Sequence, residues 1–172
     1  MKPTAVFVGP PGAGKTTVAN LVAKALGVTV RDTDQDIEAQ ESMSVADIFV
    51  TRSETEFRAL EAAAVAKALG EHEGVLAPGG GAIMNPDTRA ALAGHRVVFL
   101  DVDLSNAVAR VGMNRNRPLL LGNVRSQMKH LMDARLPFYN EVATLVVSTN
   151  DRTPAEVAAE LVFRLGQDDA VL

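Results

Sequence analysis

The stretch that most constrains the fold of this chain is GPPGAGKT, at residues 9–16, which directly follows the short apolar run AVFV. It matches the pattern G-x-x-x-x-G-K-[ST], with a strand predicted before it and an amphipathic helix after it. Glycines let several backbone N–H groups converge on one anion, and the start of the helix adds donors and the positive end of its dipole. The strand, the loop, the Lys-Thr pair and the helix together favour a grip for a nucleoside triphosphate over a turn that only joins a strand to a helix.

Within this loop the residue types indicate separate tasks. Lys15 is expected to reach the β- and γ-phosphates, and the hydroxyl of Thr16 is a hard oxygen ligand suited to Mg²⁺. The residues expected to bind ATP are those of the loop and of the first helical turn: Gly12, Ala13, Gly14, Lys15, Thr16 and Thr17. The loop alone does not indicate which group would receive the γ-phosphate.

Short apolar runs alternate with longer segments of helical period along the whole chain. Strands are predicted at residues 6–8, 28–30, 75–77, 97–100 and 145–147. Helices are predicted between them, among others at residues 16–26 before Gly27, from the capping box SETE to residue 69 before Gly70, and at residues 124–135. This alternation predicts an α/β fold in which helices cover both sides of a parallel sheet. With 172 residues the chain is expected to form a single domain over residues 1–172.

The composition excludes several classes of protein. A formal net charge of −4 argues against general nucleic-acid binding, which usually requires a basic face. The absence of cysteine excludes a disulfide scaffold and a thiolate metal site, and it is consistent with a reducing cytosol. No apolar run approaches the length of a membrane span or of a signal-peptide core. We therefore expect a cytoplasmic protein without membrane or nucleic-acid partners.

Two carboxylates follow the second predicted strand, in the sequence RDTD. Asp32 and Asp34 stand at i and i+2, so in a strand their side chains would point the same way. Ligands of open α/β sheets bind at the carboxyl ends of the strands. One carboxylate could therefore help to hold hydrated Mg²⁺, while the other positions an acceptor hydroxyl or takes its proton. The alternative is that one of them only caps the next helix, and the phosphate-binding loop favours the functional interpretation.

A cationic side chain follows at Arg58, spaced (i, i+3) from Glu61, which could orient its guanidinium. Phe49 and Phe57 lie nearby, so Arg58 could anchor a carboxylate against an apolar wall. A surface ion pair above a core is the more common arrangement for such residues. The third predicted strand runs into GGG at residues 79–81, where the backbone could approach a ligand closely or simply turn before the next helix.

The segment GMNRNRPLLLGNV, at residues 112–124, lies between two predicted helices and has the composition of a loop. Long loops in compact domains are often mobile lids. Arg115 and Arg117 lie within it, and a closing lid that brings an arginine onto a transferring phosphoryl group would stabilise its charge and expel water. The alternative is a solvated loop.

Taken together, these segments resemble the shikimate kinase family. The similarity covers almost the whole chain: GPPGAGKTT, RDTDQDIE, SVADIFVTRSETEFRALE, VLAPGGGAI, NRPLLLG and ARLPFYNEVA, in the family's order. The phosphate-binding loop is shared by very many families, whereas the set DTD, FR..E, GGG and RPLL is much more specific. The resemblance implies a three-layer α/β/α fold with a five-stranded parallel sheet and a mobile lid at about residues 112–124. It implies transfer of the ATP γ-phosphate to the 3-hydroxyl of shikimate, a step towards chorismate and the aromatic amino acids.

The resemblance also implies roles for individual residues. Thr16 is similar in position to the Mg²⁺ ligand, Asp32 to a water-linked metal ligand, and Asp34 to the residue that contacts the substrate hydroxyls and serves as base. The remaining substrate-binding positions of the family resemble Phe49, Phe57, Arg58, Glu61, Gly79, Gly80, Gly81 and Arg135. Arg117 resembles the lid arginine that touches ATP phosphate, and the adenine site resembles the neighbourhood of Arg110, Arg152 and Pro154. The implied catalytic set is Lys15, Asp34 and Arg117, in a monomer that binds ATP, Mg²⁺ and shikimate.

The chain departs from the family pattern at Pro78, which precedes the triple glycine where small hydroxyl residues are frequent. Its loop PPGAGKTT by itself resembles that of adenylate kinases. The alternatives are therefore another small-metabolite or nucleotide kinase, such as a gluconate or adenylate kinase, or a nucleotide-binding module that has lost catalysis. The second-strand carboxylates and the lid arginine, both present, disfavour the non-catalytic alternative.

Overall fold

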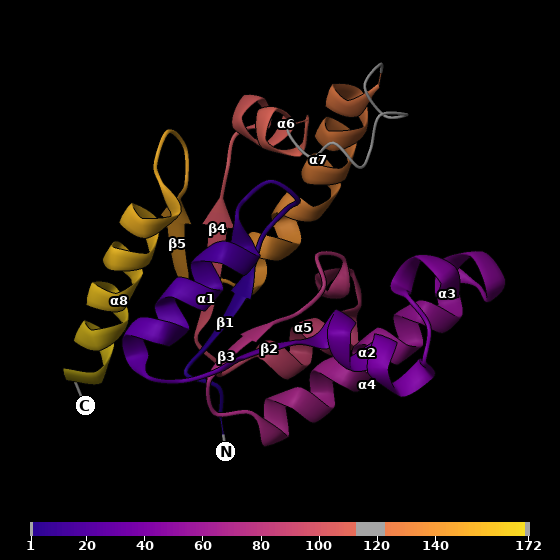
Figure 1. Ribbon diagram of the computed structural model, residues 1–172, viewed down its shortest axis with the longest axis horizontal. Helices are drawn as coiled ribbons and strands as arrows, with labels where there is room; N and C mark the ends of the chain where they lie inside the picture. The colour runs from indigo at the N-terminus through magenta and orange to yellow at the C-terminus, as the bar shows by residue number, and fades with distance from the viewer. Residues whose placement is uncertain (1, 113–122, 171–172) are drawn as a thin grey trace.

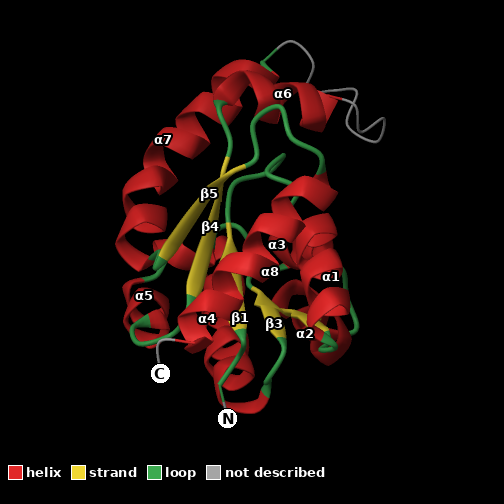
Figure 2. Cartoon of the chain, turned by 90° about the vertical axis from the view of Figure 1, so that its left-hand side faces the viewer, coloured by secondary structure: helices red, strands yellow, loops and turns green. Residues whose placement is uncertain are grey.

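The computed structural model describes residues 2–112 and 123–170 of the chain. Five parallel strands form one sheet in the order β2-β3-β1-β4-β5 (Figures 1 and 2). The strands are β1 Ala5–Val8, β2 Val30–Asp32, β3 Val75–Ala77, β4 Val97–Asp101 and β5 Leu145–Ser148. The predicted α/β fold with a five-stranded parallel sheet is thus confirmed, whereas the lid predicted at residues 112–124 lies almost entirely outside the described residues.

Helices cover both faces of this sheet. They are α1 Lys15–Leu26, α2 Thr33–Glu41, α3 Val45–Thr51, α4 Glu54–Glu71, the 3₁₀ turn η1 Ala82–Met84, α5 Pro86–Leu92, α6 Leu104–Gly112, α7 Val124–Val142 and α8 Pro154–Ala170. Alternate residues of β1 divide between the two faces: Phe7 packs with α1 and α8, and Val8 packs with α4, α5 and α7. Figure 1 shows α1 and α8 side by side on their face of the sheet. No helix in the described ranges has the length and hydropathy needed to cross a bilayer.

The second strand begins two residues later than predicted, at Val30 instead of residue 28. Gly27 ends α1 in the left-handed conformation, with φ of 71°, and the amide of Val28 donates to the carbonyl of Ala23 at 2.9 Å. Because this amide closes the end of the helix, it is not available for pairing with the sheet. Val28, which the apolar pattern assigned to the strand, therefore belongs to the C-terminal cap of α1.

Two other helix ends were predicted wrongly, and in both cases the helix is longer. Gly70 is not among the glycines with positive φ, and α4 continues through it to Glu71 before His72 ends the helix. Helix α7 continues beyond residue 135 to Val142 with Pro137 inside it. Proline removes one helical hydrogen bond, but packing of the same helix on the sheet outweighs that local cost. This extension places Tyr139 next to Gly80 of the glycine-rich loop, residues 79–81.

Candidate active site

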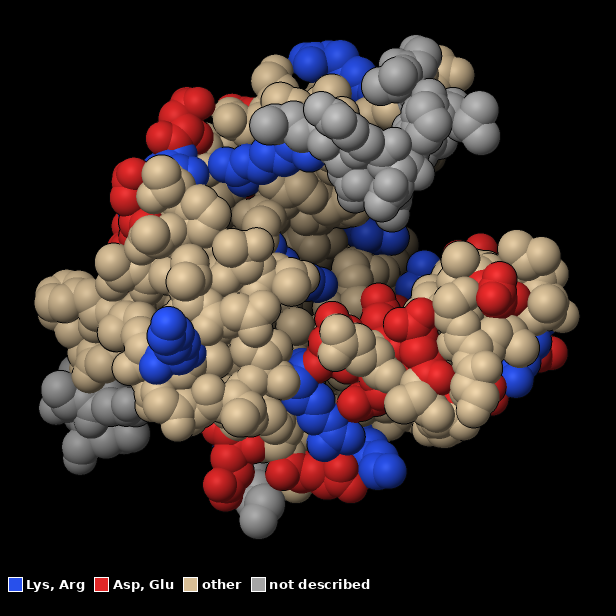
Figure 3. Space-filling view, viewed as in Figure 1, with Lys and Arg blue, Asp and Glu red and all other residues tan. Residues whose placement is uncertain are grey.

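The carboxyl ends of β1, β2 and β3 open onto one cleft of about 530 Å³. Figure 3 shows the molecule hollowed there, with Lys and Arg side chains at the base and Asp and Glu side chains over α2 along the wall. The cleft is lined by residues from the phosphate-binding loop, α1, α2, the glycine-rich loop and α6: Gly9, Pro10, Pro11, Gly12, Gly14, Lys15, Thr16, Thr17, Asp34, Gly80 and Arg110. The structure therefore brings most of the predicted ATP-binding residues together with Asp34.

The phosphate-binding loop is held open by its backbone and by one arginine. Gly12 and Gly14 have positive φ of 84° and 80°, and a Cβ on Gly12 would lie 2.7 Å from the carbonyl oxygen of Ala107. Arg110 donates to the carbonyl of Gly12 at 2.9 Å and to the hydroxyl and carbonyl of Thr149 at 2.9 and 2.5 Å. Its guanidinium thus braces the loop against the end of β5.

The residues predicted near adenine also lie close together. A small cavity of about 90 Å³ is lined by Ala13, Gly14, Arg110, Arg152 and Pro154, among others. Gly14 and Arg110 line both this cavity and the main cleft, so the two adjoin.

Lys15 extends across the cleft and donates to the carbonyl of Pro78 at 2.6 Å. Burial lowers its pKa, and the nearby carboxylates of Asp32 and Asp34 act in the opposite direction. The departure from the family pattern at Pro78 leaves this contact intact, because the acceptor is a backbone carbonyl. The ammonium is thus held between the glycine-rich loop and the phosphate-binding loop.

The predicted arrangement of Asp32 and Asp34 on one strand was wrong. The strand ends at Asp32, and Asp34 lies in the first turn of α2. The Oδ1 atom of Asp32 accepts from the amides of Asp34 and Gln35 at 2.8 and 3.3 Å, so Asp32 is the cap of α2. The structure nevertheless directs Asp34 into the cleft, because the turn into the helix rather than the strand period sets its direction.

The carboxyl group of Asp34 is half-buried and lies among charged neighbours. Its Oδ1 atom is buried and has no hydrogen-bond partner among the described residues. Burial raises the pKa of its carboxyl group, the negative charge of Asp32 adds to the effect, and Lys15 opposes it. A carboxylate with a raised pKa accepts a proton more readily than an ordinary surface carboxylate.

Each glycine at residues 79–81 leaves room for a side chain of the site. A Cβ on Gly79 would lie 2.7 Å from Asp34 Oδ1 and 2.9 Å from Glu61 Oε2. On Gly80 it would lie 3.2 Å from Arg135, and on Gly81 it would lie 2.5 to 2.9 Å from the guanidinium of Arg58. The triple glycine, interpreted from sequence as room for a ligand, is therefore also room for the side chains around it.

Arg58 and Glu61 form the pair that their spacing predicted. Arg58 Nη1 donates to Glu61 Oε1 at 2.8 Å, and the Glu61 side chain is only 3% exposed. The rings of Phe49 and Phe57 lie with centroids 4.5 Å apart, and the guanidinium lies 5.8 and 5.4 Å from them. Burial raises the pKa of Glu61 despite its arginine partner. This arrangement is an oriented cation on an apolar wall, not a surface ion pair.

Substitution of Gly81 by Ala is expected to displace the Arg58 guanidinium. The KM for the carboxylate-bearing substrate, not for ATP, should rise by about tenfold, the cost of one charge-assisted hydrogen bond. The new Cβ would occupy space now filled by Nη1, Nη2 and Cζ of Arg58. Steady-state kinetics with each co-substrate varied in turn would measure the effect. Gly70→Ala, at a helical glycine where a Cβ meets nothing within 4 Å, is the control and should leave both KM values unchanged.

Two residues near the cleft were missed by the sequence analysis. The Thr33 hydroxyl accepts from the amide of Gly79 at 3.2 Å, and the Tyr139 hydroxyl donates to the carbonyl of Gly80 at 3.1 Å. Neither has a motif, although Tyr139 is the single tyrosine of the chain. Of the predicted residues, Arg135 lies beside Gly80, whereas Arg115 and Arg117 lie outside the described residues.

Comparisons with known proteins agree with this geometry. The family model described as shikimate kinase matches residues 11–165. The chain is 55% identical over 163 residues to a shikimate kinase of Thermobifida fusca, covering 95% of this chain and 94% of that protein. It is 52% identical over 165 residues to one of Salinispora arenicola, covering 96% and 99%. The structure of a shikimate kinase from Acinetobacter baumannii in complex with shikimate is similar with a TM-score of 0.87 at 31% identity, covering 98% and 94%.

Proposed function

The chain belongs to the shikimate kinase family, and from that premise we propose that it transfers the γ-phosphate of ATP to the 3-hydroxyl of shikimate with the residues of this cleft. As a shikimate kinase it is an ATP-dependent phosphotransferase. The observation that carries the residue assignment is Asp34, a carboxylate with a raised pKa and an unpartnered oxygen, in the same cleft as the phosphate-binding loop. The match to shikimate kinases disfavours a gluconate or adenylate kinase. The presence of Asp34 and Lys15 in the cleft disfavours a non-catalytic module.

In the proposed reaction Asp34 accepts the proton of the attacking hydroxyl. The hydroxyl oxygen then bonds to the γ-phosphorus, the bond from that phosphorus to the bridging oxygen breaks, and ADP leaves with the electron pair. Lys15 is proposed to exchange its bond to the Pro78 carbonyl for the β- and γ-phosphate oxygens, whose growing negative charge it stabilises. Arg117, outside the described residues, is proposed to add a second positive charge.

The acid would be bound on the opposite wall. Arg58 and Arg135 are proposed to hold the shikimate carboxylate, since both guanidinium groups border the glycine-rich loop. Glu61 orients Arg58, and Phe49 and Phe57 would support the apolar face of the ring. The amide of Gly80 has no acceptor in the described part of the chain, so it is available to a substrate hydroxyl.

Magnesium is proposed as the cofactor, bound with ATP. Thr16 and Asp32 offer the hard oxygen ligands that Mg²⁺ prefers, Asp32 through water because its Oδ1 caps α2. Within residues 2–112 and 123–170 no three acidic or histidine side chains form a metal site, which fits a cation carried largely by phosphate and water oxygens. When bound, it would neutralise phosphate charge. We also infer a cytoplasmic monomer, since both co-substrates are soluble metabolites and one chain supplies the whole proposed site.

The proposal is tested by ADP release with shikimate, gluconate and AMP as acceptors, in the presence of Mg²⁺ and ATP. We expect turnover with shikimate alone, with phosphorus NMR placing the new phosphate on its 3-oxygen, and loss of turnover when EDTA removes the metal. Faster phosphorylation of gluconate or AMP would contradict the assigned acceptor. Undiminished turnover in EDTA would contradict the magnesium site.

A further inference from the structure

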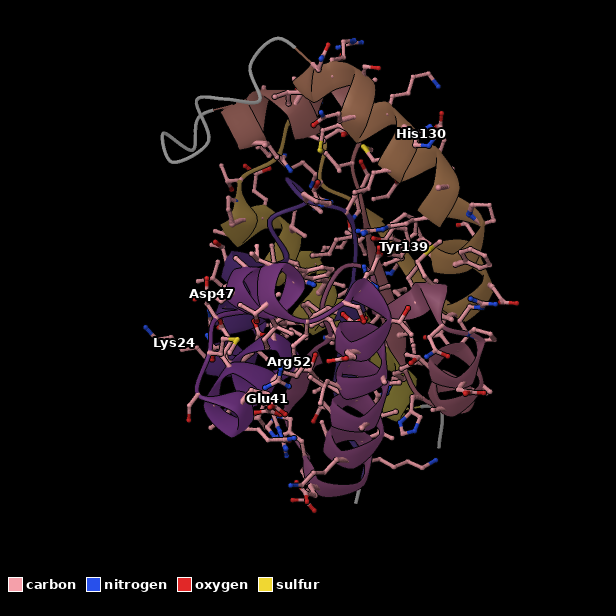
Figure 4. The ribbon with its side chains drawn as sticks, turned by 90° about the vertical axis from the view of Figure 1, so that its right-hand side faces the viewer. Lys24, Glu41, Asp47, Arg52, His130 and Tyr139 are labelled. Carbon is pink, nitrogen blue, oxygen red and sulfur yellow. The ribbon has the colours of Figure 1, made fainter. Side chains whose placement is uncertain are left out.

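Tyr139 lies in the interior of the protein, next to the proposed substrate site. It extends from α7 and is 1% exposed (Figure 4). Its ring stacks on Phe99 of β4 with centroids 4.9 Å apart at 21°. His130, on the same helix, is exposed instead. Phenylalanine would supply this packing equally well, so the stacking does not account for the hydroxyl group.

The hydroxyl group of Tyr139 holds the backbone of the glycine-rich loop. It donates to the carbonyl of Gly80 at 3.1 Å. A carbonyl oxygen can only accept, so the direction of this bond is determined. The positive charge of Arg135, one turn earlier on α7, opposes the effect of burial on the pKa of this hydroxyl. Burial raises the pKa of Tyr139, which keeps the donating proton in place over the ordinary pH range.

Arg135 lies close to two groups of the site, Lys15 and Gly80. Its charge lowers the pKa of Lys15, which means that the two positive groups repel each other across the cleft. Its guanidinium also lies beside Gly80, where a Cβ would approach it to 3.2 Å, so no side chain of that loop can hold it. The position of the guanidinium against the loop therefore depends on the position of the Gly80 peptide, which the Tyr139 hydroxyl fixes.

We propose that Tyr139 is a positioning residue for the acid substrate: its hydroxyl fixes the Gly80 peptide, against which the Arg135 guanidinium lies, so that both groups meet the substrate without reorganisation. This inference rests on the proposed function, since it takes Arg135 and Gly80 as binding groups for shikimate. Tyr139 itself would not touch the substrate. Its contribution is expected in the binding of the acid, not in the phosphoryl transfer or in the binding of ATP.

The test is Tyr139→Phe, which keeps the ring and removes one oxygen. We expect the KM for shikimate to rise by about five- to tenfold, as for loss of a buried hydrogen bond that fixes a binding loop. The kcat and the KM for ATP should change little. Phe138→Leu is the control, because it alters packing at the neighbouring residue of α7 and leaves the hydroxyl in place. An unchanged KM for shikimate in Tyr139→Phe, or an equal rise in Phe138→Leu, would overturn the proposal.

A double-mutant cycle shows whether Tyr139 acts through Arg135. In an Arg135→Ala background, Tyr139→Phe should raise the KM for shikimate much less than in the wild-type background. Equal increases of the KM in the two backgrounds would show that Tyr139 does not act through Arg135. A readout without substrate separates this inference from the proposed function: the NMR signals of the Arg135 guanidinium and of the Gly81 amide should shift in ligand-free Tyr139→Phe. Absence of shikimate phosphorylation by the wild-type protein would contradict the proposed function. Unshifted NMR signals in Tyr139→Phe would instead contradict the positioning role of Tyr139.

Discussion

Replacement of Asp34 by Asn is expected to lower kcat by about 10²- to 10⁴-fold, the range of general base catalysis, and at the same time to raise the melting temperature. The amide cannot accept the hydroxyl proton, so the chemical step fails while the ATP site is left in place. The gain in stability follows from the buried Oδ1 atom and from the raised pKa, since both show that the folded protein disfavours the ionised carboxyl group. Each kcal/mol gained should raise the melting temperature by about 2–4 °C.

The pH dependence of that stability gain has a definite sign. Because the pKa of Asp34 is raised in the folded protein, ionisation destabilises the fold as the pH rises from the unfolded-state pKa through the folded-state pKa. The advantage of Asp34→Asn should therefore be largest above the folded-state pKa and should vanish at low pH, where Asp34 is protonated. Glu61, whose pKa is also raised, is present in both proteins and cancels in the comparison.

Thermal unfolding followed across pH, together with single-turnover kinetics, would measure both effects. Asp36→Asn is the matched control, since Asp36 is on the same helix but pairs with Arg31 at 2.7 Å. It should leave kcat unchanged and should not raise the melting temperature. The role of Asp34 as base would be wrong if Asp34→Asn kept a kcat close to that of the wild type.

Replacement of Lys15 by Ala is expected to reduce kcat/KM for ATP by about 10³-fold or more, as for other cations that stabilise a transferring phosphoryl group. The ammonium bridges the phosphate-binding loop and the Pro78 carbonyl. Its loss would also remove the positive charge that opposes the raised pKa of Asp34. The acidic limb of the pH–rate profile should therefore move further towards neutral pH in any residual activity.

Lys24→Ala is the control for Lys15. Lys24 is on the same helix, in its exposed last turn, away from the cleft (Figure 4). Both variants lose one positive charge, so a general effect of net charge on ATP binding would affect them equally. Steady-state kinetics and titration with a fluorescent ATP analogue would separate turnover from binding. Activity of Lys15→Ala within tenfold of the wild type would contradict the assigned role.

Local sequence patterns were sufficient to predict most of the separate elements and the phosphate-binding loop. These signals act between residues that are close in the chain. They are the pattern G-x-x-x-x-G-K-[ST], the caps at Ser53 and Gly27, and the (i, i+3) spacing of Arg58 and Glu61. Such signals can be recognised in a single stretch of sequence because the interacting groups are within one or two turns of each other. The alternation of strands and helices likewise indicated a parallel sheet.

Which distant groups meet could be known only from the folded structure. Packing between separate elements determines three features of the fold. They are the strand order β2-β3-β1-β4-β5, the turn of Asp34 into the cleft from α2, and the continuation of α7 past Pro137. The same packing sets Arg58 against Gly81 and Tyr139 against Gly80. No local pattern encodes these pairs, because their partners lie far apart in the chain and meet only after the helices cover the sheet.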